Sequence, residues 1–355
     1  MEKVKLSDIC NPKQWKAIST SDLLNEGYPV YGANGVIGYY NEYNHENPVV
    51  TVTCRGATCG SINITVPKAY VTGNAMCLDD LRSDVEIEYL YYCLKHYDFK
   101  NIISGSAQPQ ITRQGMEKIY IMLCSQEEQK DIVKKLKKTE KIIKLTKQEL
   151  QSLDNLIKAR FVELFGDPRS NPFSFDEWML KDTCKVVTGN TPSRAVSEYY
   201  GNYVEWIKTD NIVSGLLNPT KATECLSEKG MEAGRIVERD SILMACIAGS
   251  IASIGRVCVT DRTVAFNQQI NAVVPEKYNV LFLYVLLQIS KDYLVEDVNM
   301  ALKGILSKSK LEEKKFIVPP IELQNQFADF VNQVDKSKVI NQPLQKMELY
   351  VSHYN

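Results

Sequence analysis

The sequence has little of what metalloenzymes and most hydrolases use. Its 355 residues include only three His, and its ten Cys stand singly, with no CxxC pair. We therefore expect no Cys/His metal site, and we interpret the cysteines as buried free thiols in a reducing compartment. A GxxxxGK(S/T) phosphate loop, an HExxH helix and a GxSxG turn are also missing. These absences predict a chain with no catalytic residue and no bound metal.

Long apolar runs are missing as well. No stretch reaches the roughly 18 apolar residues of a membrane span, and the first ten residues, MEKVKLSDIC, contain no apolar signal core. We expect a cytoplasmic protein without a membrane contact. A strong charge imbalance is also absent, because the net charge is −1. A protein that binds DNA only through contacts to the phosphate backbone is more basic than this chain. DNA binding would therefore need local clusters of cations, or phosphate contacts from another subunit.

What the sequence does have is an uninterrupted helical stretch at its centre, residues 125–166. Ser125 followed by Glu128 is a capping-box start, and no Gly or Pro intervenes before Gly166. A helix of about 40 residues is about 60 Å long and needs a partner for its apolar seam. The seam residues follow heptad spacing and are Ile132, Leu136, Ile143, Leu150, Leu153, Ile157 and Leu164. Thr139, Thr146 and Arg160 fall on the same seam as its weak members. The Lys-rich remainder is interpreted as a solvated coiled-coil face rather than a nucleic-acid contact.

The chain also contains a long-period internal repeat, and its length predicts two domains or a little more. In the rear half of each copy, matching residues lie 255 − 60 = 195 positions apart. They pair Gly60 with Gly255, Tyr89 with Tyr284, Met116 with Leu311, Glu117 with Glu312, Glu127 with Glu322, Gln129 with Gln324 and Lys141 with Lys336. Near the front, residues 6–10 (LSDIC) match 180–184 (LKDTC) at a spacing of 174. The second copy is therefore longer in its front half by about 195 − 174 = 21 residues.

Each copy follows one plan: a short strand, Gly-rich β segments, a helix, a polar turn, a last strand and a long helix. The intermediate helices are expected at 85–99 and 279–294. The predicted fold class is α+β, with two α/β modules in tandem repeat, separated by two long antiparallel coiled-coil helices. The predicted domains are a first module at 1–124, the central long helix at 125–166 as a spacer, a second module at 167–319 and a C-terminal long helix at 320–355.

The C-terminal helix is the natural partner of the central one. It begins after Pro319-Pro320, and at the repeat offset its seam consists of Phe327, Val331 and Val334. We expect the two helices to pack antiparallel, with one module at each end. Pro343 falls inside this helix, and proline breaks or kinks a helix interior at a cost of about 3 kcal/mol. The helix is therefore expected to be shorter, kinked or frayed past that point.

Two similar modules on a rigid two-helix spacer suit a long ligand with two separated sites, and duplex DNA fits this arrangement. Bases are read by Arg, Asn, Gln, Ser and Thr side chains, which the loops offer. In the first module the DNA-binding candidates are Tyr31, Asn34, Arg55, Thr58, Ser61, Asn74, Ser106, Gln108 and Gln110. In the second module they are Thr191, Ser193, Arg194, Lys208, Asp210, Asn211, Ser250, Arg256, Asn267 and Gln268. Arg55 and Arg256 stand next to Gly residues and are the stronger pair; for any one candidate, a turn or surface role is the alternative interpretation.

Three segments carry a family resemblance. They are YPVYGANGVIGYYNEY (28–43) with the Gly56/Gly60 region, TGNTPSRAVSEYYGNYVEWIKTDNI (188–212), and the VPPIELQ start of the last helix (318–324). With them the chain resembles the specificity subunits of type I restriction–modification enzymes, over essentially its whole length. The order of target-recognition domain, helix, target-recognition domain, helix is the same. The first copy departs by having LCS (123–125) in place of the prolines, although Glu127 and Gln129 remain.

The resemblance implies a function for the chain. Such a subunit has no catalytic activity; each target-recognition domain reads one half of a split DNA sequence, and the helices act as a ruler for the unspecified gap. The same helices dock two modification subunits, which use S-adenosylmethionine to methylate adenine. Restriction subunits join them to form a nuclease that depends on ATP and Mg. This chain would then bind no cofactor itself, and the weak net charge would reflect phosphate contacts that the partners share.

Two other hypotheses stay open. A non-catalytic coiled-coil protein-interaction adaptor with two ligand-binding modules would have no sequence-dependent DNA affinity, even with partners present. A methyltransferase with fused recognition domains would need an Asn/Asp-Pro-Pro-aromatic loop for the target amine, which the sequence lacks. Binding of S-adenosylmethionine by the isolated chain would revive that hypothesis.

Overall fold

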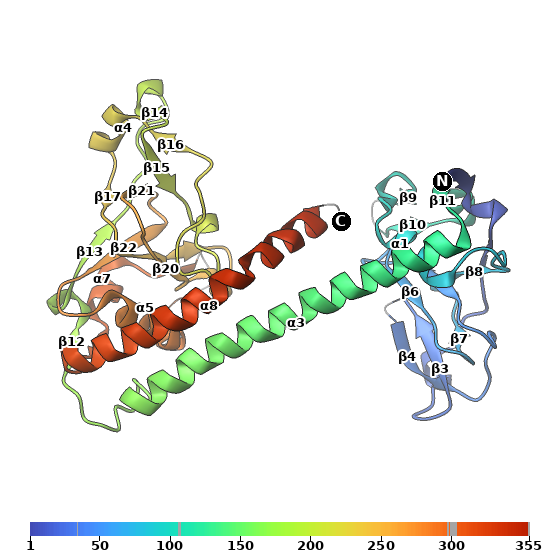
Figure 1. Cartoon of the computed structure of the whole chain (residues 1–355), viewed down its shortest axis with the longest axis horizontal. Coiled ribbons are helices and arrows are strands. Elements are labelled where there is room, and N and C mark those ends of the chain that lie inside the picture. The colour runs from blue at the N-terminus through green and yellow to red at the C-terminus, as the bar shows by residue number, and fades with distance from the viewer. Residues whose placement is uncertain (34, 106–107, 297, 299–303, 354–355) are drawn as a thin grey trace. The chain divides into compact units, whose positions relative to one another are not determined.

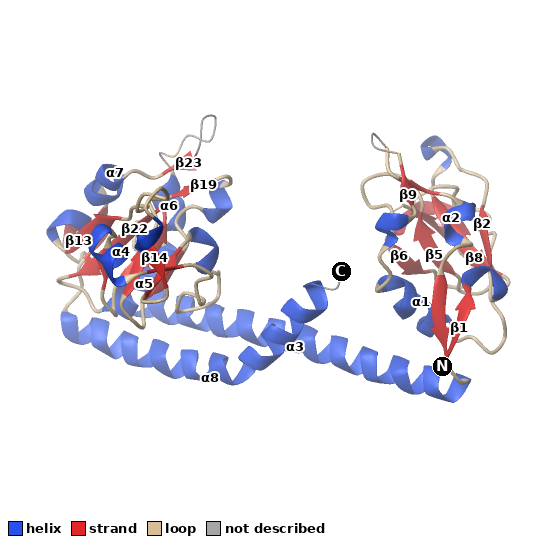
Figure 2. Cartoon of the chain, turned by 90° about the horizontal axis from the view of Figure 1, so that it is seen from above, coloured by secondary structure: helices blue, strands red, loops and turns tan. Residues whose placement is uncertain are grey.

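The computed structural model describes residues 1–353 apart from 34, 106–107, 297 and 299–303, and for 339–353 it describes the backbone only. The chain divides into two compact units: Met1–Thr146 with Pro343–Asn355, and Lys147–Gln342. Both units combine helices and strands (Figures 1 and 2), so the predicted α+β class is confirmed. Within the described residues, no helix is both long and apolar enough to cross a membrane.

The first unit is built around a four-stranded antiparallel sheet. Its strands are β1 Glu2–Lys5, β2 Asn11–Gln14, β3 Tyr28–Gly32, β4 Gly35–Tyr40, β5 Val50–Thr53, β6 Ile62–Ile64, β7 Tyr70–Val71, β8 Ala75–Asp79, β9 Ile103–Ser104, β10 Gln110–Ile111 and β11 Tyr120–Leu123. Its short helices are α1 Ile87–Lys95 and α2 Arg113–Met116. The main sheet has the order β2-β8-β5-β6 and carries α1, and a smaller sheet has the order β4-β3-β7, in which β3 and β7 are parallel. β1 pairs with β11, and β9 with β10.

The second unit contains an equivalent sheet and a larger second one. Its strands are β12 Glu177–Met179, β13 Cys184–Thr188, β14 Tyr200–Gly201, β15 Val204–Ile207, β16 Cys225–Leu226, β17 Ile236–Val237, β18 Ile242–Ala245, β19 Ile247–Ala248, β20 Val257–Val259, β21 Val264–Phe266, β22 Ile270–Pro275, β23 Gly304–Ile305 and β24 Lys315–Ile317. Its short helices are α4 Glu228–Ala233, α5 Val280–Ile289, α6 Lys291–Val295 and α7 Lys308–Glu313. The main sheet has the order β13-β22-β18-β20, and the other β14-β16-β15-β21-β17. β12 pairs with β24, and β19 with β23.

The internal repeat is confirmed by the hydrogen-bonding pattern. The Leu6 N–H donates to the Ile119 carbonyl at 2.9 Å, and the Leu180 N–H donates to the Lys314 carbonyl at 2.9 Å. The parallel pair β3–β7 recurs as β15–β21. The order β4-β3-β7 therefore corresponds to β16-β15-β21, and the longer second copy adds β14 and β17 at the two edges of this sheet.

The long central helix is α3, Gln126–Phe165, and it contains 40 residues. Its capping box is formed, because the Glu128 carboxylate accepts from the Ser125 N–H at 3.0 Å and from the Ser125 hydroxyl at 2.8 Å. Beyond the helix, Gly166 has a φ of +71°, and a Cβ there would overlap Pro172. Only glycine fits this position, which fixes the end of α3. The boundary between the two units falls inside α3, after Thr146.

One buried glutamine joins each long helix to its module. Gln129 is fully buried; its amide oxygen accepts from the Glu86 N–H, and its amide group donates to the carbonyls of Asp84 and Cys124. Gln324, at the repeat offset and 1% exposed, accepts from the Asn279 N–H and donates to the Pro319 carbonyl. Glu86 and Asn279 are the N-caps of α1 and α5. The same amide contacts thus hold the first turn of each long helix against the N-terminus of the preceding helix.

Within the second unit, the end of α3 packs antiparallel against the start of α8 (Ile321–His353), as predicted. Phe161 and Phe165 contact Phe327, with ring centroids 5.5 Å apart in both pairs. Farther along the pair, Lys338 forms an ion pair with Asp154. The heptad pattern missed both α3 phenylalanines, because it placed Arg160 and Leu164 at the seam. Both rings are fully buried, whereas Arg160 pairs with Glu163 at the surface.

The remaining seam candidates differ in their burial. Ile132 and Leu136 are partly buried against the core of the first unit, beside the unpredicted Val133, which is 6% exposed. Ile157, Phe327, Val331 and Val334 are buried in the core of the second unit, with Leu153 and Leu164 at its edge. Ile143 and Leu150 are half-buried outside these cores. The backbone of α8 continues past Pro343 to His353, and α8 contains 33 residues against the 40 of α3.

Candidate nucleic-acid interface

In the first unit, several predicted DNA-binding residues gather at one end of the main sheet. β5 runs antiparallel to β6 and β8, so it ends where both of them begin. Arg55 follows β5, Ser61 precedes β6 and Asn74 precedes β8. Gln110 joins them through a backbone bridge to Arg55. We call this place the sheet end of the first unit.

The second unit has an equivalent sheet end. β18 ends where β20 and β22 begin, with Arg256 directly before β20 and Gln268 shortly before β22. Lys208 follows β15 at the same place, because the Asn267 N–H donates to the Ile207 carbonyl at 3.0 Å. The first unit has the corresponding bond from Thr72 to Tyr31, also at 3.0 Å. The repeat thus brings candidates from four separate segments together in the first copy and from three in the second.

Exposure divides the candidates of the first unit. Arg55, Ser61, Asn74, Gln108 and Gln110 are exposed, and Thr58 is half-buried. Tyr31 is 8% exposed, and its hydroxyl accepts from the Val66 N–H at 3.2 Å. This burial argues against base reading by Tyr31. Asn34 and Ser106 lie outside the described residues.

In the second unit, two asparagine candidates serve the fold. Asn211 is 8% exposed; its amide oxygen accepts from the Lys208 N–H, and its amide group donates to Thr220 and Lys221. Asn267 is 5% exposed, and both ends of its amide bond to Gln269. Their polar atoms are already used, which argues against base contacts by either. Among the other candidates, Lys208 and Arg256 are half-buried. The exposed candidates are Thr191, Ser193, Arg194, Asp210, Ser250 and Gln268.

One carboxylate organises the cations at this sheet end. Glu224, directly before β16, accepts from the Arg194 guanidinium at 2.7 Å and from the Lys208 ammonium at 2.6 Å. The Arg194 guanidinium lies 4.5 Å from the ring centroid of Tyr200 and 5.3 Å from that of Trp206, and the Lys208 ammonium lies 5.1 Å from Trp206. Hydrogen bonds from Lys208 and then Arg194 lower the pKa of Glu224. We call these five residues the Glu224 cluster.

Sequence reasoning missed three members of this cluster. Tyr200 and Trp206 lie within the segment that carried the family resemblance, but their aromatic rings gave no signal of a cation platform. Glu224 lies 16 residues beyond Lys208 and has no local motif. Only the pairing of β15 with β16, in which Glu205 faces Cys225, brings Glu224 beside Lys208.

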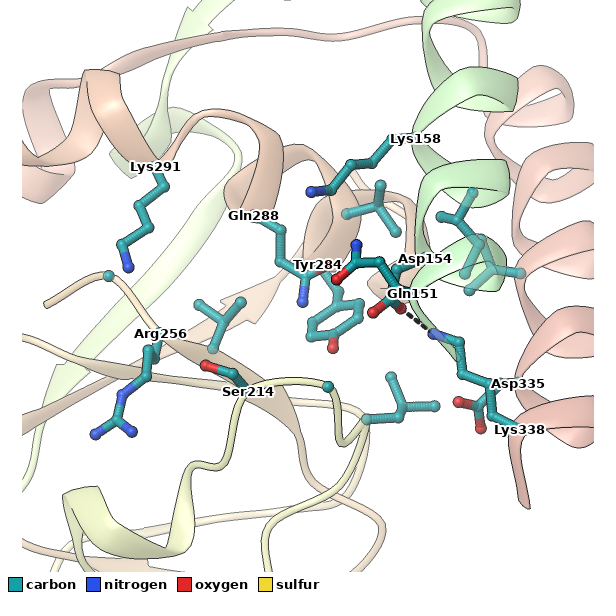
Figure 3. Close-up of a pocket in the computed structure, with 17 residues that line it drawn as sticks. Gln151, Asp154, Lys158, Ser214, Arg256, Tyr284, Gln288, Lys291, Asp335 and Lys338 are labelled. Atoms are coloured by element: carbon teal, nitrogen blue, oxygen red, sulfur yellow. Dashed lines mark hydrogen bonds and ion pairs between the residues drawn. The ribbon is translucent and has the colours of Figure 1, made fainter. Parts of the chain in front are cut away.

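Arg256 occupies a different environment from Arg55. Its guanidinium donates to the carbonyls of Ser253 and Thr209, at 3.3 Å in each case, and it borders a cavity of about 290 Å³. Figure 3 shows Arg256 and Lys291 on one side of this cavity, and the Asp154–Lys338 pair on the other. At the repeat offset from Gly60 and Gly255, Arg256 corresponds to Ser61. The two arginines are therefore not equivalent positions of the repeat, which corrects their treatment as one pair.

One group of side chains has the composition of a metal site. Ligand atoms of His45, Cys77 and Asp79 lie within 4.8 Å of one another. However, Nε2 of His45 faces one Asp79 oxygen at 3.0 Å, Nδ1 faces the Asn44 amide oxygen at 2.6 Å, and Trp15 donates to the other Asp79 oxygen at 3.0 Å. Burial raises the pKa of the Cys77 thiol and so disfavours the thiolate that binds metal. The hydrogen bonds among these side chains therefore account for the group as part of the fold rather than as a metal site.

Comparison with known proteins gives a consistent result. The family model described as type I restriction modification DNA specificity domain matches residues 1–155 and 174–349. The HindI specificity subunit of Haemophilus influenzae is 28% identical over 163 residues, 40% of this chain and 34% of that protein. The MjaIX specificity subunit of Methanocaldococcus jannaschii is 24% identical over 300 residues, 76% of this chain and 66% of that protein. The chain thus matches about a third of the length of the first relative.

Two solved structures share the fold. The S subunit of a type I restriction–modification system from M. genitalium superposes with a TM-score of 0.67 at 15% identity, over 99% of this chain and 94% of that one. A chain from a study of complex assembly and conformational transition of the type I R-M system gives a TM-score of 0.54 at 16% identity, with the same coverage. At these identities the similarity concerns the fold alone.

Proposed function

Because this chain belongs to the family of type I restriction modification DNA specificity domains, we propose that it is a sequence-specific DNA-binding subunit that reads a bipartite target. The observation that supports this best is the equivalent sheet end of each unit. Each sheet end presents exposed polar residues of the types that read base edges, such as Arg55 and Asn74 in one copy and Arg194 and Gln268 in the other. Two such sites on one chain suit a split recognition sequence.

The proposal includes partners that carry out the chemistry. The chain would be non-catalytic and would dock two modification subunits, which use S-adenosylmethionine to methylate adenine. Restriction subunits would add a nuclease that depends on ATP and Mg. The net charge of −1 supports shared phosphate contacts, because DNA affinity from this chain alone would need more positive charge. The complex would work in the cytoplasm on genomic DNA.

The decisive experiment is a long-read methylation map of the host with the gene intact, deleted and restored. We expect one split motif to lose adenine methylation on deletion and to regain it on restoration. If no motif changes, the chain should next be combined with the products of its neighbouring genes and tested on random DNA. Equal affinity for all sequences in that complex would refute the proposal and favour the protein-interaction adaptor. Binding of S-adenosylmethionine by the isolated chain would instead favour the fused methyltransferase.

A further inference from the structure

The Glu224 cluster combines charges of both signs at the sheet end of the second unit. Arg194 is 57% exposed, Glu224 35% and Lys208 28%. The acidic group lies between the two cations and accepts a hydrogen bond from each of them. All three side chains reach the surface, so a ligand could contact the guanidinium and the carboxylate together.

The guanidinium of Arg194 is held in a defined position before any ligand arrives. It stacks on Tyr200 and Trp206, and both rings are anchored. The Tyr200 hydroxyl donates to the Pro192 carbonyl at 2.6 Å, and the Trp206 indole N–H donates to the Asn190 carbonyl at 3.3 Å. A stacked, ion-paired arginine loses less conformational entropy on binding than a free one.

A carboxylate between the cations does not suit a phosphate site. A phosphate near Arg194 and Lys208 would also approach the Glu224 carboxylate, and like charges repel. Glu224 stays ionised at neutral pH, because its two partners lower its pKa. The edge of a base pair, by contrast, offers hydrogen-bond acceptors and donors side by side, so it can bind a cation and a carboxylate together. Arginine donates to O6 and N7 of guanine, and a carboxylate accepts from the N4 amine of cytosine.

A purely structural ion pair in the same sheet looks different. Glu205 pairs with Arg262, but its carboxylate also accepts from the backbone N–H of Ala222 and is only 22% exposed. Glu205 thereby ties a loop to the strand. In the described part of the chain, the Glu224 carboxylate accepts only from the Arg194 and Lys208 side chains. It can therefore exchange a side-chain partner for a ligand without breaking a backbone contact.

We propose that Arg194 and Glu224 read one G·C base pair in the half-site of the second unit, with Arg194 on guanine and Glu224 on cytosine. Lys208 acts as a positioning residue that keeps Glu224 beside Arg194. Glu224 also adds selectivity, because it repels phosphates at nonspecific sites and leaves an unpaired acceptor against a wrong base. The inference rests on the proposed function and adds the identity of one base pair to it.

The test uses the methylating complex in cells, with Glu224→Gln and Arg194→Lys variants. Arg194→Lys keeps the charge but loses the paired donors that match guanine. For each variant, the methylation map gives the half-site, and competition between duplexes with single base changes gives the discrimination in binding. We expect discrimination at one G·C position to fall about 5- to 150-fold in both variants. The other half-site and the gap should not change.

The matched control is Glu198→Gln, since Glu198 forms an exposed ion pair with Lys229 on the same unit. This variant should leave every position of the motif unchanged. Unchanged discrimination at all positions in both test variants would overturn the inference, and so would an equal loss on every sequence, which would place Arg194 on phosphate or in the fold. A wild-type complex without any split motif would refute the proposed function instead. Thermal unfolding of each variant separates these results from a folding defect.

Discussion

At the scale of single residues, the environment of a side chain separates two arginines that the sequence treats alike. Arg55 is exposed at its sheet end. Arg256 is half-buried, and its guanidinium donates to the carbonyls of Ser253 and Thr209. An exposed arginine at a candidate interface is available to a ligand, whereas Arg256 also holds two backbone segments together.

We predict that Arg55→Ala changes the free energy of unfolding by no more than about 0.5 kcal/mol. The same change should weaken specific DNA binding by about 1–3 kcal/mol if Arg55 reads a base. Arg256→Ala should lower the free energy of unfolding by about 1–3 kcal/mol, since it removes a donor from the Ser253 carbonyl and one of the two donors of the Thr209 carbonyl, which also accepts from the Ile212 N–H. Denaturant unfolding and duplex competition measure the two quantities. Equal effects of both substitutions on stability would contradict this division.

Burial also separates Phe161 from its neighbour on α3. The Phe161 ring is fully buried against Phe165, Phe282 and Phe327, while Val162 is 49% exposed. Phe161→Ala is therefore expected to lower the free energy of unfolding by about 3–5 kcal/mol, through lost burial and the cavity that remains. Val162→Ala is the matched control and should change it by no more than about 0.5 kcal/mol. Urea denaturation of both variants is the measurement; similar midpoints would show that the helix pair does not depend on this cluster.

At the scale of elements, the two glutamine joints make a paired prediction. Gln129→Leu and Gln324→Leu each leave a partly buried backbone N–H and at least one buried carbonyl unpaired. We expect each change to lower the free energy of unfolding by about 1–3 kcal/mol. Gln126→Ala serves as the control in the first turn of α3, where the side chain is exposed. Gln126→Ala should lower the free energy of unfolding much less. An equal loss in this control would show that the contacts of Gln129 and Gln324 do not contribute specially to stability.

The α3–α8 pair contains a carboxyl group whose titration has a predictable sign. Burial raises the pKa of Asp335, and the charge of Asp154 raises it further, although Lys338 opposes both effects. A carboxyl with a raised pKa in the folded state destabilises the fold once it is ionised, so stability falls as the pH rises through that value. Asp335→Asn should therefore increase the free energy of unfolding at pH 7. The gain should disappear below the ordinary aspartate pKa of about 3.9.

Unfolding measured between pH 3 and pH 8 tests this prediction. The control is Asp329→Asn, an exposed site on the same helix, which should change the free energy of unfolding at pH 7 by no more than about 0.5 kcal/mol. A stabilisation by Asp335→Asn that did not vary with pH would point to packing rather than to charge.

At the scale of the whole molecule, the proposed ruler makes the strongest prediction. One heptad added to each long helix lengthens it by about 10.5 Å, close to three base pairs at about 3.4 Å per step. We expect the gap of the split motif to grow by about three base pairs, while both half-sites keep their sequences. The methylation map of the host gives the result directly. An unchanged gap with a working complex would refute the ruler.

How much the sequence predicted depends on the range of the interactions involved. The ends of α3 follow from Ser125, Glu128 and Gly166, and the repeat follows from matched residues such as Gln129 and Gln324. These features are local, because a helix is defined by contacts three and four residues apart and by its caps. The α+β class and the antiparallel start of the helix pair followed from the same local signals.

The candidate site depended on tertiary structure. Asn211 and Asn267 look like base readers in the sequence, but each amide oxygen accepts from a backbone N–H two or three residues away, and the Asn211 amide group also donates across a loop to Thr220 and Lys221. Glu224 gives no signal of its own, and only the pairing of β15 with β16 brings it to Lys208. The sequence by itself determined the elements, their order and their repetition, because those rest on short-range contacts. Which polar side chains come together at the sheet ends was decided by contacts between distant segments, which exist only once the sheets have formed.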